Sequence, residues 1–174
     1  MQQMTRIPMS SAVASVMSRF PVLVDARASA ELAASIATMH GVHHLLVVDE
    51  AELVGVVCRC DLENAEPGDA VSSLMCSPAT VIGEDDELEQ AARVMIECGV
   101  GCLPVVGRTK TLAGIVTRRD LRSAGVLPGR RGFDRCVACG TSHRLRPPAD
   151  PAEAAICSAC FRKSVQVERA ATNL

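Results

Sequence analysis

The 174-residue chain is predicted to adopt a mixed α/β fold of the α+β type, in which two similar units pack as a pseudo-symmetric pair and a small C-terminal segment follows. Three observations carry this prediction: an internal repeat, a regular succession of short apolar runs and amphipathic segments within each repeat, and four closely spaced cysteines near the C-terminus. Hydrophobic residues make up 48% of the chain, so a packed core is available and wholesale disorder is excluded.

The repeat decides the fold, because self-similarity in order and spacing marks a duplicated structural unit. Four blocks recur in the same order, three of them 58 positions apart and the last after one extra residue. The matching blocks are AVASVM (12–17) with AVSSLM (70–75), AASIATMHGV (33–42) with AARVMIECGV (91–100), LLVV (45–48) with LPVV (103–106), and LVGVVCRCDL (53–62) with LAGIVTRRDL (112–121). We therefore place a first unit at residues 8–65 and a second unit at residues 66–126, with EPGD (66–69) as the joint.

Each unit predicts the order strand–helix–strand–strand–helix. Residues 30–39 and 86–97 place apolar side chains at three- and four-residue spacing, as an amphipathic helix does, and Gly41 and Gly99 follow these helices at the C′ position. Short apolar runs predict the strands, the last two of each unit form a hairpin, and a short helix follows each hairpin. The predicted strands are 22–24, 45–49 and 53–57 in the first unit and 80–82, 102–106 and 112–116 in the second.

The stretch GIVTRRD, from Gly114 to Asp120, runs from a predicted strand into a helix start. Free N–H groups and the positive dipole end of a helix favour an anion at such a point, where the Thr117 hydroxyl can bond a phosphate or ribose oxygen and Asp120 can accept from ribose hydroxyls. Arg118 and Arg119 add charge that suits a polyphosphate. The same Thr-x-x-Asp spacing is close to a helix capping box, and the two roles do not exclude one another.

A unit that ends in a hairpin and Gly–hydrophobic–x–Thr–x–x–Asp–Leu resembles the cystathionine-β-synthase (CBS) domain, and two in tandem resemble a CBS pair, or Bateman module. The resemblance covers about residues 8–125 and is strongest for LPVV and LAGIVTRRDL of the second unit. The first unit departs from the pattern, since Leu46 stands where the proline would be and Cys58 where the threonine would be. The resemblance implies a homodimer with an adenine nucleotide bound in a cleft between the units.

By this resemblance Thr117 and Asp120 hold the ribose and phosphate of the ligand. The resemblance also implies that Thr80, Val81 and Ile82 border the adenine. Gly114, Arg118 and Arg119 of the same motif are the remaining candidate nucleotide-binding residues. In the first unit Asp61 is in place, but Cys58 is a poor hydrogen-bonding substitute for threonine, so we expect a weaker site there. AMP, ADP, ATP, a dinucleotide and S-adenosylmethionine all remain open as the ligand.

The C-terminal cysteines form the pattern CxxC-x17-CxxC, with Cys136, Cys139, Cys157 and Cys160 as candidate metal ligands. Each CxxC turn directs two sulfurs at one point, and four thiolates in a tetrahedron suit zinc, with iron as the minor alternative. The segment resembles a zinc ribbon, which we place at residues 135–174 after a linker at residues 127–134. Because the segment has almost no apolar core, we expect its metal to be structural. The scattered cysteines of the two units are expected to act mainly as small apolar residues, with a redox sensor as the alternative.

The charge of the chain changes sign near the end of the second unit. Residues 1–129 hold 10 Lys+Arg against 16 Asp+Glu, whereas residues 130–174 hold 8 against 4. This asymmetry predicts two parts of the chain with different functions. Once the charge of four zinc-bound thiolates is included, the ribbon is only weakly basic, so a protein contact or a purely structural role is favoured over nucleic-acid binding.

The sequence holds no set of nucleophile, base and orienting group, no phosphate-binding loop and no open three-ligand metal site, which predicts a protein that is not an enzyme. We expect a cytoplasmic regulatory sensor that binds an adenine nucleotide and presents its ribbon, or its dimer, to a protein partner. The alternative is a transcription-associated or nucleic-acid-binding regulator that uses the ribbon, and a third reading is a regulatory subunit of a separate enzyme. No membrane role is expected, because no apolar run approaches the roughly 20 residues of a bilayer span.

Overall fold

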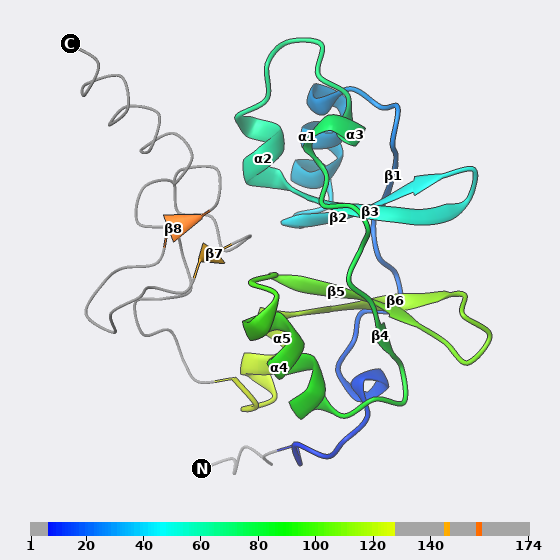
Figure 1. Cartoon of the computed structure of the whole chain (residues 1–174), viewed down its shortest axis with the longest axis vertical. Helices are drawn as coiled ribbons and strands as arrows, with labels where there is room; N and C mark the ends of the chain where they lie inside the picture. The colour runs from blue at the N-terminus through cyan, green and yellow to red at the C-terminus, as the bar shows by residue number, and fades with distance from the viewer. Residues whose placement is uncertain (1–6, 128–144, 147–155, 158–174) are drawn as a thin grey trace.

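The computed structural model describes residues 7–127 and two short strands at residues 145–146 and 156–157. Residues 7–127 form two three-stranded sheets that are stacked face to face, with helices on their outer sides (Figure 1). Each sheet belongs to one of the predicted units, so the mixed α+β fold with two repeats is confirmed. No helix of this described part of the chain is long and apolar enough to cross a membrane.

The first unit has the predicted order of elements. It consists of β1 (Leu23–Asp25), α1 (Ala30–Met39), β2 (His44–Asp49), β3 (Glu52–Cys58) and α2 (Arg59–Glu63). β1 pairs with β2 in parallel and β2 pairs with β3 antiparallel, so β2 is the central strand. Helix α1 begins at the predicted residue because the Ser29 side chain caps it, accepting the Leu32 N–H at 3.2 Å.

The second unit repeats this topology. It consists of β4 (Ile82–Gly83), α4 (Leu88–Glu97), β5 (Cys102–Val106), β6 (Leu112–Thr117) and α5 (Arg118–Ser123). Helix α4 begins two residues after the predicted start at residue 86. The reason is a separate turn ahead of the helix, in which the Asp86 carboxylate accepts the Gly83 N–H at 2.8 Å.

Both long helices end at the predicted glycines. Gly41 and Gly99 have positive φ angles of 63° and 64°, the left-handed conformation that glycine adopts without strain. At the end of α4 the Gly99 N–H donates to the Ile96 carbonyl at 3.2 Å, and the Val100 N–H donates to the Met95 carbonyl at 3.1 Å. This pair of bonds is a Schellman motif, and it satisfies two carbonyls that the helix itself leaves open.

Two short helical segments were not predicted, and each packs against the unit to which it does not belong in sequence. The 3-10 helix η1 (Val13–Ser15) precedes the first unit's sheet, yet Val13 is buried in the core of the second unit beside Ile82 and Leu88. Helix α3 (Val71–Leu74) falls in the second repeat, yet Val71 is buried in the core of the first unit. The connecting segments therefore cross between the two sheets.

A third core lies where the two sheets face each other. It contains Leu46 and Val56 from the first sheet and Cys102 and Ile115 from the second, all of them buried. Burial of these facing side chains joins the two units into one molecule.

In the predicted ribbon, the structure describes one pair of short strands. Strands β7 (Leu145–Arg146) and β8 (Ile156–Cys157) pair antiparallel, with Leu145 opposite Cys157. Of the four predicted metal ligands, Cys136, Cys139 and Cys160 lie outside the described residues.

Candidate ligand-binding junctions

The last strand of each unit leads directly into a short helix, and these two turns hold the predicted ligand-binding residues. We call residues 55–61, where β3 meets α2, the first junction, and residues 114–120, where β6 meets α5, the second junction. The two junctions are equivalent by repeat. In each, the residue before the helix is its N-cap, Cys58 in the first and Thr117 in the second.

The second junction is closed by a complete capping box. The Asp120 carboxylate accepts the Thr117 N–H at 2.8 Å and the Thr117 hydroxyl at 2.6 Å, through the same oxygen, Oδ2. In return, the Asp120 N–H donates to the Thr117 hydroxyl oxygen at 3.4 Å. The capping alternative raised by the sequence is therefore present. Both side chains remain partly exposed, so the cap does not remove them from contact with a ligand.

The N–H groups at the start of α5 are less available than the sequence suggested. The Arg118 N–H donates to the Gly101 carbonyl at 3.0 Å, and the Asp120 N–H is used in the capping box. The expectation of a free row of N–H groups is thus corrected, because the turn before β5 and the cap take up two of the first three. An anion at this junction must therefore rely mainly on side chains, since few N–H groups of the helix end are left for it.

The two arginines of the second junction differ in environment. Arg119 is exposed at the surface. Arg118 is partly buried, and its Nη2 donates to the Met95 carbonyl of α4 at 3.1 Å. The sequence analysis predicted the same role for both residues, but the structure places them in different surroundings.

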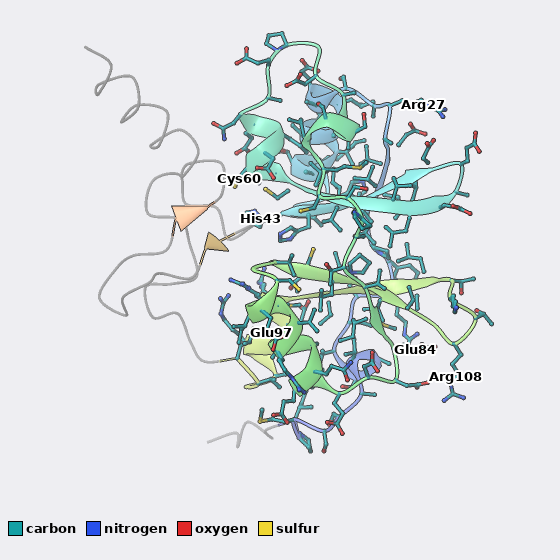
Figure 2. The ribbon with its side chains drawn as sticks, viewed as in Figure 1. Arg27, His43, Cys60, Glu84, Glu97 and Arg108 are labelled. Carbon is teal, nitrogen blue, oxygen red and sulfur yellow. The ribbon has the colours of Figure 1, made fainter. Side chains whose placement is uncertain are left out.

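The first junction builds the same cap with a thiol. The Cys58 Sγ donates to the Asp61 carboxylate at 3.1 Å and accepts the Asp61 N–H at 3.3 Å. Only 3% of Cys58 is exposed, and the pKa of its thiol is raised by hydrogen bonding to Cys60, by burial and by the Asp61 charge. His43 and Cys60 lie at the same edge of the first unit (Figure 2), where the Arg59 N–H donates to the His43 carbonyl at 2.9 Å.

The remaining predicted positions fall into two groups. Thr80 and Val81 are exposed just before β4, whereas Ile82 is 3% exposed and belongs to the core of the second unit. Gly114 is buried, and a Cβ at this position would overlap the Ser18 carbonyl oxygen. Its repeat partner Gly55 faces the Cys76 carbonyl oxygen in the same way, at 2.7 Å from a hypothetical Cβ.

These glycines mark the places where the crossing segments meet the sheets, which sequence reasoning did not find. Ser18 exchanges two backbone hydrogen bonds with Ile115, both 2.9 Å, and Cys76 exchanges two with Val56, at 2.8 and 3.1 Å. The repeated Gly–hydrophobic pair was the signal that could have revealed a close backbone approach. Within the described residues, no group of three His, Cys, Asp or Glu side chains is placed to hold a metal ion.

Comparison with known proteins supports the repeat reading. The sequence model described as the CBS domain matches residues 13–68 and 71–126. The chain is 28% identical over 112 residues to the L-aspartate semialdehyde sulfurtransferase of Methanocaldococcus jannaschii, an alignment that spans 63% of this chain and 22% of the relative. The chain covers less than half the length of the first curated relatives that it matches.

Solved structures of similar fold include complexes with adenosine-containing ligands. The CBS domain pair of protein MJ0100, in complex with 5′-methylthioadenosine and S-adenosyl-L-methionine, has a TM-score of 0.61 and 27% identity over 66% of this chain and 94% of that one. CBSX2 from Arabidopsis thaliana in complex with AMP has a TM-score of 0.58 and 28% identity over 67% of this chain and 96% of that one.

Proposed function

The chain belongs to the CBS domain family, and we propose that it is a non-enzymatic regulatory protein that binds an adenine nucleotide at the second junction. One observation carries the proposal: Thr117 and Asp120 hold each other in place by direct hydrogen bonds, yet both side chains stay partly exposed. The similar structures of MJ0100 and CBSX2 hold adenosine-containing ligands, which supports the choice of ligand class.

Each side chain of the second junction has a definite part in this proposal. A carboxylate has about four acceptor positions, so Asp120 can accept ribose hydroxyls while its Oδ2 keeps the cap. The Thr117 hydroxyl donates its one hydrogen to Asp120, so it can accept a bond from the same ligand through its remaining lone pair. Arg119 is the exposed cation that can meet a phosphate, and Thr80 and Val81 supply exposed side chains for the base. Asp61 offers the same carboxylate at the first junction, where the buried Cys58 thiol makes the weaker site.

Native mass spectrometry of the full chain, with and without AMP, ADP, ATP and S-adenosylmethionine, tests the proposal. We expect a mass increment from at least one of these ligands, on a species that also reports the oligomeric state. The homodimer implied by the family resemblance predicts twice the chain mass. Absence of an increment from all four ligands would contradict nucleotide binding and leave the pair as a scaffold.

Asp120→Ala assigns the binding to this junction. We expect the affinity for the ligand found above to fall about tenfold or more, because a hydrogen bond to a charged acceptor is lost. The variant also loses half of its capping box, at a cost to the free energy of unfolding of about 1 kcal/mol. Isothermal titration calorimetry measures the affinity, and chemical denaturation measures the stability.

Asp61→Ala is the matched control, since Asp61 occupies the same capping position in the first unit. It should lose a similar amount of stability and little affinity. Equal affinity of Asp120→Ala and the wild-type protein would remove Asp120 from the site. A loss of affinity in both variants alike would point to a shared effect of stability.

For the C-terminal segment we propose a structural zinc site formed by Cys136, Cys139, Cys157 and Cys160. Its support is the CxxC-x17-CxxC spacing together with the antiparallel pairing of β7 and β8, which lies between the two CxxC turns and ends at Cys157. A site closed by four thiolates leaves no position for a substrate, which fits a structural role. We propose that this segment meets a protein partner of the nucleotide-binding pair.

A further inference from the structure

Arg118 ties the second junction to the end of the neighbouring helix at two points. Its backbone N–H donates to the Gly101 carbonyl, in the turn between α4 and β5, at 3.0 Å. Its guanidinium donates to the Met95 carbonyl, near the C-terminal end of α4, at 3.1 Å. Helices α4 and α5 lie next to each other on the outer side of the second sheet (Figure 1). The bond to Met95 therefore links the start of α5 to the neighbouring helix.

The bond to Met95 is placed where a cation is most effective. Met95 lies in the last turn of α4, where the carbonyl ends of the helix dipole carry partial negative charge. The same carbonyl already accepts the Val100 N–H at 3.1 Å in the Schellman motif. The arginine therefore adds a second, charged donor to a carbonyl that is satisfied without it, and the helix end does not depend on Arg118 to form.

The equivalent residue of the first unit has made a different contact. The Arg59 N–H donates to the His43 carbonyl at 2.9 Å, as the repeat requires. Its side chain, however, pairs with Glu63 at 2.9 Å, one turn further along its own helix. The second unit therefore has a side-chain link from its junction to the neighbouring helix, whereas the arginine of the first unit pairs within its own helix. The shared fold alone does not produce this link.

We infer that Arg118 is a positioning residue that couples the Thr117–Asp120 pair to the C-terminal end of α4. Arg118 follows Thr117 directly in sequence, so a ligand that restrains the Thr117–Asp120 pair also restrains Arg118 and, through it, the Met95–Val100 turn. Ile96, the neighbour of Met95 in the last turn of α4, is apolar and 62% exposed. The turn that Arg118 restrains is therefore part of the molecular surface. This inference rests on the proposed function, because it requires a ligand at the second junction.

Hydrogen exchange of the full chain tests the coupling, with AMP as the probe and Arg118→Gln as the variant. In the wild-type protein we expect AMP to slow exchange of the Gly99 and Val100 amides, whose N–H groups form the Schellman motif. In Arg118→Gln we expect AMP still to bind, about three- to tenfold more weakly, and the protection at these two amides to be lost at saturating AMP. Arg118→Lys should restore part of it, since an ammonium can donate one bond to the Met95 carbonyl.

Arg59→Gln is the matched control and should leave both the affinity and the protection unchanged. Protection of Gly99 and Val100 by AMP that persists in Arg118→Gln would overturn the coupling while leaving the proposed function intact. A variant that is less stable but keeps the protection would show a merely structural role and would overturn it as well. Failure of the wild-type protein to bind AMP would overturn both proposals for this ligand, and it is seen in the binding measurement before any variant is compared.

Discussion

Two thiols of the second unit lie in opposite environments. Cys102 is buried in the core between the sheets, whereas Cys98 is exposed at the C-terminal end of α4. Burial, with a further contribution from the charge of Cys76, raises the pKa of Cys102 from 9.0 to about 12. Because the thiolate is the reactive form, an alkylating reagent applied to the native protein reaches Cys98 and spares Cys102.

The raised pKa of Cys102 predicts a loss of stability at alkaline pH. The folded protein holds the Cys102 proton more tightly than the unfolded chain does, so this stabilisation is fully present below about pH 9 and is lost as the pH rises toward 12. We expect the free energy of unfolding, measured by denaturant titration, to fall over this window. Cys102→Ala should show a shallower fall, and an unchanged pH dependence in that variant would argue against the assignment. The chain has no tyrosine, which removes one competing titration from the same window.

At the second junction, what the sequence could predict was the local part. Thr117 and Asp120 are three residues apart at a helix start, and that spacing alone brings their polar atoms together. The direction of the Arg118 side chain could not be predicted in this way. Its acceptor, Met95, is 23 residues away, and the equivalent Arg59 takes a partner on its own helix instead.

At the scale of elements, the crossing segments fix the residues that strands β3 and β6 can carry. The segment around Ser18 runs so close to β6 that a side chain at Gly114 would overlap the Ser18 carbonyl oxygen. We therefore expect Gly114→Ala to lower the free energy of unfolding by about 1–3 kcal/mol, as overpacking against backbone does. Chemical denaturation of the full chain measures the change.

Gly107→Ala is the control for this prediction, because the nearest atom to its Cβ would be the Glu84 carboxylate oxygen at 3.2 Å, at the end of a flexible side chain. That variant should change the stability by a few tenths of a kcal/mol at most. If Gly114→Ala were as stable as Gly107→Ala, the close approach of the Ser18 segment to β6 would be wrong.

The elements that the sequence predicted well are those with their own local signals. Helix α1 has its serine cap and its terminal Gly41, and its predicted and observed bounds agree. Helix α4 begins later than predicted because the Asp86 carboxylate accepts the Gly83 N–H in a separate turn. Asp86 therefore lies in that turn and not in the first turn of the helix. No local sequence pattern indicated that η1 packs in the core of the second unit and α3 in the core of the first. Both are single turns whose burial is decided by the opposite sheet.

For the molecule as a whole, the near-symmetry of the two units makes their differences informative. The first junction has a buried thiol in its cap and an arginine paired within its own helix. The second has a hydroxyl in its cap, an exposed Arg119 and a bond that reaches the next helix. The pair therefore has one polar, partly exposed junction and one thiol-capped junction. On the proposed function, we expect a single ligand per chain at the second junction rather than two equal ones.

The stability of the pair and that of the proposed zinc site should be separable. Within the part of the chain that the structure describes, the three hydrophobic cores are built of residues between positions 7 and 127, whereas the four proposed ligands lie beyond position 135. Cys157→Ser removes one thiolate from the proposed site, and we expect it to abolish stoichiometric zinc. Elemental analysis of the purified full chain measures the zinc, and calorimetry measures the unfolding of the pair.

In this variant the main unfolding transition and the affinity for adenine nucleotide should match those of the wild-type protein, because neither depends on the metal. Cys98→Ser is the matched control: it removes an exposed cysteine from the pair and should leave the zinc content at one per chain. Full zinc content in Cys157→Ser would refute the four-cysteine site. Loss of the pair's own transition together with the zinc would mean that the C-terminal segment is part of the folding unit, and the regulatory link to a partner would then have to pass through the pair itself.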